Sequence, residues 1–66
     1  MEMITVRSSA IAAVGYDPVT RHMRISFRSG GTYDFCGVPK NVYEQFMASA
    51  SMGRYYHAHI ENRYRC

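Results

Sequence analysis

The stretch HMRISFRSGGTYDFC, residues 22–36, decides the fold. Its apolar residues fall on alternate positions on either side of a pair of glycines: Met23, Ile25, Phe27, Tyr33 and Phe35. Alternation with a period of two is typical of strands that bury one face. Glycines suit the left-handed positions of a short hairpin loop. The stretch therefore predicts a β-hairpin with one apolar face.

The register of this hairpin follows from keeping the apolar residues of both strands on one face. A two-residue loop would place Phe27 opposite the charged Asp34, so we predict a three-residue loop over residues 29–31. The predicted pairs are Phe27 with Tyr33 and Ile25 with Phe35.

A third strand is predicted before the hairpin. Residues 10–14 (AIAAV) are apolar at successive positions, which fits a strand covered on both faces or one lying at an oligomer contact. Asp17 and Pro18 then favour a turn, predicted over residues 17–20. The predicted pairs across this turn are Val14 with Met23 and Ala12 with Ile25.

Two short helices are predicted after the sheet. Pro39 suits the first turn of a helix, and the residues after it carry an apolar stripe at helical spacing: Val42, Tyr43, Phe46, Met47 and Ala50. A second helix over about residues 52–62, with Ser51 as its N-cap, buries Met52, Tyr56 and Ile60. The fold class is therefore α+β: a three-stranded or four-stranded antiparallel sheet, followed by two short C-terminal helices packed on its alternating apolar face.

Size and composition limit the functions that are possible. The 66 residues weigh 7.6 kDa, which allows one domain over residues 1–66 and excludes a multidomain enzyme with a deep cavity. A formal charge of +3 favours an anionic partner. The chain has eight Lys and Arg, of which only Lys40 is lysine, and six Tyr. Both Arg and Tyr suit stacking and hydrogen bonding, and the small size favours a homo-oligomer.

The sequence also predicts a cytoplasmic protein with no membrane association. No apolar run approaches the roughly 20 residues that cross a bilayer, and the first residues lack the pattern of a secretory signal. In a reducing compartment, Cys36 and Cys66 are expected to be free thiols rather than a disulfide. Cys36 then acts as a small apolar residue.

The most informative candidate site is SMGRYYH, residues 51–57. A helix that begins at Ser51 would present unpaired N–H groups, Gly53 would let a ligand approach the backbone, and Arg54 would bind phosphate. Tyr55 offers a ring on which a base can stack, with Tyr16 and Tyr33 as further candidates. The alternative is purely structural: Ser51 as an N-cap, Gly53 as a helix junction and Arg54 as a solvated side chain.

Other basic residues are assigned weaker roles. Arg24 and Arg28 share the polar face of the hairpin with Asp34, and we interpret them as a solvated face rather than a phosphate-binding strip. Arg63 and Arg65 form a cationic tail that is too short to be specific.

Neither catalysis nor metal binding is predicted, and no cofactor is expected. His57 and His59 are two residues apart, so on a helix they point in different directions, and His22 is far away in sequence. The carboxylates are scattered, so no pair is arranged for acid–base chemistry. We therefore expect a binding module rather than an enzyme.

The sequence resembles the KTSC domain family over nearly its whole length. The resemblance rests on the segments VGYD (14–17), FRSGG (27–31), YDF (33–35), VP (38–39), VY (42–43) and SMGRYY (51–56), with Ile60 and Tyr64. The family has a central aromatic-x-aromatic motif, here residues 33–35, and a later Ser-x-Gly-x-Tyr-aromatic motif, here residues 51–56. Members often carry Asn after that motif, whereas this chain has His57.

The resemblance implies a function in binding rather than chemistry. The family is named after the C-terminus of some lysyl-tRNA synthetases, which suggests RNA as the ligand, and it also occurs as small stand-alone proteins of bacteria and phages. The prediction is a non-catalytic module that binds RNA or a small or cyclic nucleotide, with His57 added to the candidate site. Two alternatives stay open: a phage-type inhibitor that sequesters a nucleotide immune signal, and a protein-interaction module that self-associates through residues 10–14.

Overall fold

The hairpin predicted from residues 22–36 is the second half of a four-stranded antiparallel meander. The computed structural model describes residues 1–66 and has the strand order β1-β2-β3-β4. The strands are β1 (Met3–Thr5), β2 (Ile11–Asp17), β3 (His22–Phe27) and β4 (Thr32–Phe35). The sheet thus has four strands, the larger of the two predicted numbers, because the N-terminal β1 pairs with β2.

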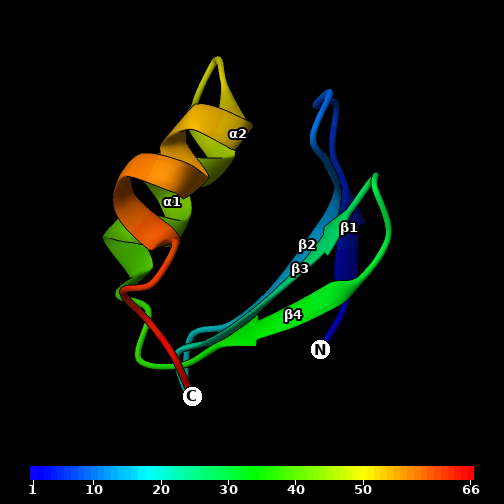
Figure 1. Ribbon diagram of the computed structural model, residues 1–66. Helices are drawn as coiled ribbons and strands as arrows, with labels where there is room; N and C mark the ends of the chain where they lie inside the picture. The colour runs from blue at the N-terminus through cyan, green and yellow to red at the C-terminus, as the bar shows by residue number, and fades with distance from the viewer.

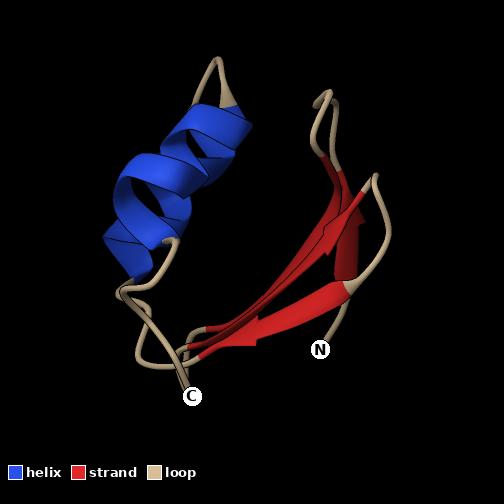
Figure 2. Cartoon of the chain, viewed as in Figure 1, coloured by secondary structure: helices blue, strands red, loops and turns tan.

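The helical segments lie together on one face of the sheet (Figures 1 and 2). Helix α1 spans Lys40–Ala48, and α2 spans Met52–Tyr55 and continues directly into the π-helical turn η1, Tyr56–Ile60. Pro39 is the N-cap of α1 rather than part of its first turn. The α+β architecture with two C-terminal helices is confirmed. No helix has the length and apolar character needed to span a bilayer.

The predicted hairpin register is wrong by two residues. Ile25 pairs with Tyr33 and Met23 with Phe35. The loop covers residues 28–31 instead of 29–31, since β3 ends at Phe27 and β4 begins at Thr32. Gly30 and Gly31 both adopt positive φ, 106° and 87°, so the reversal uses both of them. A shift of two residues leaves every side chain on its predicted face, since faces alternate with a period of two.

The turn between β2 and β3 is displaced in the same way. Val14 pairs with Ile25 and Tyr16 with Met23, so the loop covers residues 18–21 instead of 17–20. The Asp17 carboxylate accepts hydrogen bonds from the backbone N–H groups of Val19 and Thr20. The prediction ended the strand too early because Asp17 both forms this turn and still pairs with His22.

The core lies between the sheet and the helices. Its nine buried residues are Ile11, Val14, Met23, Ile25, Phe35, Val38, Phe46, Met52 and Ile60. Two members of the predicted apolar face are outside this set: Phe27 is partly buried and Tyr33 is 56% exposed. Both lie toward the hairpin tip, where the helices cover less of the sheet.

Residues 10–14, proposed as a surface for self-association, offer no free strand edge to a second copy. Strand β2 lies inside the sheet, paired with β1 on one edge and β3 on the other. Ile11 and Val14 are fully buried in the core. The apolar run is therefore explained by packing within one chain.

The cysteines also differ from prediction, because Cys36 and Cys66 form a disulfide. The C-terminal segment returns to the edge of β4, where Phe35 and Arg65 form a backbone bridge. The Cys36 N–H donates to the Tyr64 carbonyl at 2.8 Å, and the two cysteine Cα atoms lie 4.8 Å apart. The expectation of free thiols rested on compartment alone and could not include this tertiary contact.

Candidate functional site

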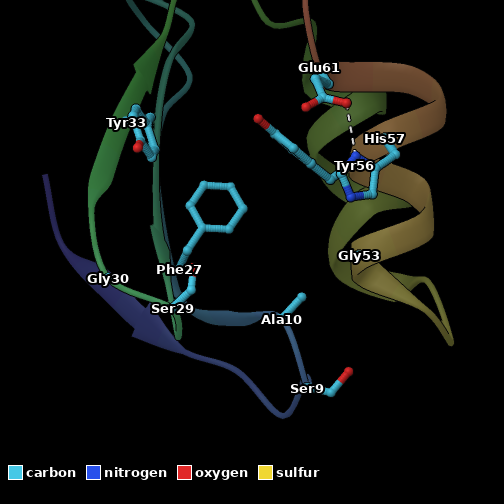
Figure 3. Close-up of a pocket in the computed structure, with 10 residues that line it drawn as sticks. All are labelled: Ser9, Ala10, Phe27, Ser29, Gly30, Tyr33, Gly53, Tyr56, His57 and Glu61. Carbon is cyan, nitrogen blue, oxygen red and sulfur yellow. Dashed lines mark hydrogen bonds and ion pairs between the residues drawn. The ribbon is translucent and has the colours of Figure 1, made fainter.

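A groove of about 490 Å³ separates the β3–β4 hairpin from the helical segment α2–η1. Figure 3 shows aromatic side chains on its opposite walls. Its lining residues are Ser9, Ala10, Phe27, Ser29, Gly30, Tyr33, Gly53, Tyr56, His57 and Glu61.

Three rings form the apolar part of the groove. Phe27 lies edge-on to both Tyr33 and Tyr56, with ring centroids 5.7 and 5.1 Å away. In Figure 3 the Tyr56 ring extends from η1 toward the sheet, while Phe27 and Tyr33 approach from the sheet side. Because more than half of Tyr33 is exposed, its ring face is available to a planar ligand.

Small residues keep the groove open at one end. Gly30, at the hairpin tip, carries no side chain, and its positive φ favours glycine there. Gly53 lies where α2 approaches Ala10 closely, since a Cβ at Gly53 would stand 3.3 Å from the Ala10 Cβ. A ligand can therefore reach backbone atoms on both walls.

The polar groups of the groove come from η1. Burial raises the pKa of the Tyr56 hydroxyl, and the neighbouring Glu61 and Tyr33 raise it further. This hydroxyl is therefore protonated at neutral pH and can donate a hydrogen bond. His57 Nδ1 lies 2.8 Å from the Glu61 carboxylate, one helical turn away at the rim. The pair fixes the His57 ring beside the opening.

A smaller polar hollow of about 190 Å³ adjoins the groove and shares Ser9 and Gly53 with it. Arg7 and Ser51 both line this hollow. The first N–H groups of α2 have no backbone acceptor, and Ser51 makes no side-chain cap bond. Sequence reasoning missed Arg7, because only the tertiary fold brings it next to residues 51–53.

On its other side the groove continues into a hollow of about 470 Å³. The two share Tyr33, Tyr56 and Glu61, and the second adds Arg65 and the C-terminal residues to the wall. The aromatic groove thus adjoins a further hollow on each side, through shared lining residues.

The structure places some of the predicted site residues in the groove or the polar hollow and others in neither. Tyr33, Gly53 and His57 line the aromatic groove, and Ser51 lines the polar hollow. Arg54 lines none of the three, and it is exposed without an ionic partner. It is next in the chain to Gly53.

Two predicted stacking residues have structural contacts instead. The Tyr55 ring packs against His59 and Phe46, and its hydroxyl donates to Gln45 of α1. The Tyr16 hydroxyl donates to the Val38 carbonyl at 2.7 Å. The Tyr16 ring stacks on Tyr43 with a centroid distance of 4.4 Å. Neither residue lines the groove, and Tyr56, assigned to the core, lines it instead.

The hairpin arginines are occupied, as the interpretation of a solvated face requires. Arg24 Nε donates to Asp34 at 2.7 Å, an exposed pair worth about 0–1 kcal/mol. Arg28 donates to the backbone carbonyls of Ser8 and Val6, so it links the hairpin to the β1–β2 connection. Neither side chain is free to bind phosphate.

The histidines are distributed differently from the sequence spacing. His59 packs on Tyr55, and His57 pairs with Glu61, so the two do not form a site together. His22, in contrast, lies beside both cysteines, with the three ligand atoms within 4.8 Å of one another.

The comparisons with known proteins agree on one family. The model of a family described as the KTSC domain matches residues 7–64. A crystal structure of a KTSC domain protein from Yersinia pestis superposes with a TM-score of 0.92 at 38% identity, covering 96% of this chain and 89% of that one.

Three relatives are similar in sequence. A protein of Tsukamurella paurometabola is 38% identical over 63 residues, covering 96% of this chain and 94% of its own. A protein of Stutzerimonas stutzeri is 30% identical, covering 85% of this chain and 79% of its own. A lysine–tRNA ligase of a Nostoc species is 30% identical over 63 residues, which are only 11% of that ligase.

Proposed function

The chain belongs to the KTSC domain family, and we propose that it binds single-stranded RNA, or a nucleotide unit of it, without transforming it. The observation that carries the proposal is the groove between the β3–β4 hairpin and α2–η1, with Tyr33 and Tyr56 on its walls. Every base has a π-face, so an aromatic groove binds single strands with little regard to sequence.

The aromatic groove suits the base. A base stacked on Tyr33 contributes about 1–3 kcal/mol. The Tyr56 hydroxyl, kept protonated by burial, is placed to donate to a base acceptor. Phe27 supports both rings by its edge contacts, so the two tyrosines are held apart without filling the groove.

The adjoining polar hollow suits the phosphate. Arg7 supplies a planar guanidinium, and Ser51 and the first N–H groups of α2 face the same space. Arg54 is exposed next to Gly53 and adds a second unpaired positive charge. The distribution of charge supports the anionic partner that the net charge of +3 favours.

The open shape favours a chain over an enclosed small ligand. Pockets for small molecules bury most of the ligand surface, whereas this groove opens at both ends into further hollows. A strand can continue past either end. Sequestration of a cyclic nucleotide signal, as by a phage inhibitor, is therefore the alternative. The similarity to part of a lysine–tRNA ligase is a further reason to favour RNA.

Titration with short single-stranded RNA and with mono-, di- and cyclic nucleotides tests the proposal. RNA should bind, and two phosphate contacts should give a salt slope of about −1.4, a loss of about sevenfold in affinity from about 50 to about 200 mM salt. Arg7→Ala or Arg54→Ala should each reduce the slope by about 0.7. Lys40→Ala is the control, because Lys40 is exposed and neither it nor its chain neighbours line a hollow, whereas Arg54 is next to Gly53, which does.

The results separate the alternatives. Tight, salt-sensitive binding of a cyclic nucleotide with weak binding of RNA would favour the sequestering inhibitor. The absence of binding by any of these ligands, or equal effects of Arg7→Ala and Lys40→Ala, would contradict the proposed site.

We also propose that the protein self-associates, through strand β1 instead of residues 10–14. Edge strand β1 exposes Ile4 (46%), and Met1 (50% exposed) precedes the strand in the chain. A second copy that pairs with this edge would bury both, since an open strand edge is a template for pairing. Light scattering should then give a mass that rises with concentration and that Ile4→Lys returns to the monomer. A monomer at all concentrations would exclude the homo-oligomer.

A further inference from the structure

Three potential metal ligands meet at the end of the sheet where β2 turns into β3. Cys36 follows β4, His22 begins β3, and Cys66 lies one residue beyond the Phe35–Arg65 bridge. Their ligand atoms all lie within 4.8 Å of one another, and His22 Nδ1 is 3.9 Å from Cys36 Sγ. No other group of His, Cys, Asp and Glu comes together in this way.

The spacing of these atoms is close to that of a tetrahedral zinc site. Zinc binds sulfur at about 2.3 Å and histidine nitrogen at about 2.0 Å, which places neighbouring ligand atoms about 3.5–3.8 Å apart. His22 Nδ1 and Cys36 Sγ already have nearly this separation. The Cys66 sulfur must move, away from the Cys36 sulfur to which it is bonded in the disulfide and closer to His22, since the atoms of the cluster now lie up to 4.8 Å apart. Cys66 is exposed, so rotation of its side chain can supply this movement.

The Asp34 carboxylate lies beside the histidine ring. His22 Nε2 lies 3.1 Å from this carboxylate, which Arg24 also contacts. The Nε2 N–H is not aimed at this oxygen and has no hydrogen-bond partner, and a small rotation of the ring would form a hydrogen bond between them. Metal-binding histidines usually donate their second N–H to a carboxylate in this way.

We propose that the reduced protein binds one thiophilic divalent metal ion, such as Zn²⁺, through Cys36, Cys66 and His22. Two thiolates and an imidazole suit such an ion, and a water molecule completes the tetrahedron. Asp34 is a positioning residue that fixes the His22 ring. Asp34 and Cys66 also line the hollow into which the groove continues, but the metal proposal does not depend on the proposed function.

The metal and the disulfide compete for the same two sulfurs. A dithiol reductant transfers two electrons and two protons to the disulfide, which yields two thiols, and the reductant becomes a disulfide itself. The metal ion then displaces one proton from each thiol and binds the two thiolates. The redox state of the surroundings thus decides whether a covalent bond or a metal ion joins the C-terminal segment to β4.

Cobalt(II) is the probe that tests the site, because its visible spectrum reports thiolate ligands and tetrahedral geometry. The full chain is titrated with Co²⁺ without oxygen, first oxidised and then after reduction with a phosphine. The reduced protein should bind one Co²⁺ per chain with a thiolate charge-transfer band, and Zn²⁺ should displace it. The oxidised protein should show no such band.

Variants assign the ligands. Cys66→Ser should remove the charge-transfer binding, His22→Ala should weaken Co²⁺ by about 10-fold or more, and Asp34→Asn by about 10- to 100-fold. His57→Ala is the matched control and should leave the affinity unchanged, because His57 pairs with Glu61 away from the cluster. Circular dichroism follows folding in parallel. Should the reduced chain unfold, refolding on addition of Zn²⁺ would also support the site.

Three results would overturn the proposal. The first is a reduced protein that binds no Co²⁺ at one equivalent. The second is equal affinity of His22→Ala and His57→Ala. The third is a reduced chain that unfolds and is not restored by Zn²⁺. In each case the disulfide would be a covalent link only.

Discussion

Tyrosine side chains have different surroundings at the two ends of the sheet. At the end where β2 turns into β3, here called the closed end, Tyr16 stacks on Tyr43 and its hydroxyl donates to the Val38 carbonyl. Toward the hairpin tip, here called the open end, Tyr33 is 56% exposed and lines the groove with Tyr56. A tyrosine whose ring face and hydroxyl both have partners stabilises the fold, and one without them is available to a ligand.

The largest expected effect is the loss of the Tyr16 ring. Tyr16→Ala should lower the free energy of unfolding by about 2–4 kcal/mol, because it removes a stacked ring and leaves the buried Val38 carbonyl without its partner. Urea denaturation measures this change. The RNA affinity of the folded fraction should stay the same, and a lower affinity would place Tyr16 in the binding site and end the distinction between the two ends.

Tyr33 should show the opposite behaviour. Tyr33→Ala should cost less than about 1 kcal/mol of stability, since the side chain is mostly exposed, but should weaken RNA binding by about 5- to 150-fold through the loss of about 1–3 kcal/mol of stacking. Fluorescence anisotropy with labelled RNA measures the affinity. Tyr33→Phe is the control, because it keeps the ring and should retain most of the binding.

The hydroxyl of Tyr16 is a smaller and more specific test. Tyr16→Phe keeps the stack on Tyr43 and removes only the 2.7 Å hydrogen bond to Val38. We expect a loss of about 1–2 kcal/mol, because a buried carbonyl loses its donor. Thermal denaturation shows whether this occurs. An unchanged midpoint would mean that water satisfies the Val38 carbonyl and that this end is less closed than described.

The smallest effect concerns pH at the closed end. The backbone N–H of Val19, with a further contribution from that of Thr20, holds the pKa of Asp17 below its ordinary value. A depressed pKa stabilises the folded state above the ordinary pKa, and this contribution is lost as the pH falls through the lower folded value. Asp17→Asn should therefore flatten the decline of stability below about pH 4. If the stability of the wild type and of Asp17→Asn fell equally at acid pH, the turn would not depend on this charge.

The sequence patterns predicted the face of the sheet on which each side chain lies better than they predicted which residues pair across neighbouring strands. Alternation in residues 22–36 identified the hairpin and the faces of its strands. A shift of the pairing by two residues leaves each side chain on the same face, because side chains alternate between the faces with a period of two. It could not give the register, since a pair of glycines does not show how many neighbouring residues join the loop. The Asp17 turn failed for a similar reason, because its start depends on whether Asp17 still pairs across the sheet.

Apart from Tyr33, the predicted residues that line the groove and the polar hollow belong to one segment of the sequence. Ser51, Gly53 and His57 belong to one segment and remain near one another in the structure. Arg7 is more than forty positions away, so no spacing rule could associate it with Ser51. The roles of Tyr55 and Tyr56 were exchanged because helical periodicity cannot say whether a residue faces a neighbouring helix or an open groove.

The central claim is that ligand binds at the open end and leaves the closed end unaffected. Nuclear magnetic resonance of the ¹⁵N-labelled protein, titrated with a short single-stranded RNA, tests this most directly, because each backbone amide reports its own surroundings. We predict saturable shifts at Arg7, Gly30, Gly53 and Tyr56, with those of Tyr16 and Tyr43 unchanged. Shifts confined to Tyr16 and Tyr43, or no shifts at saturating RNA, would contradict the account.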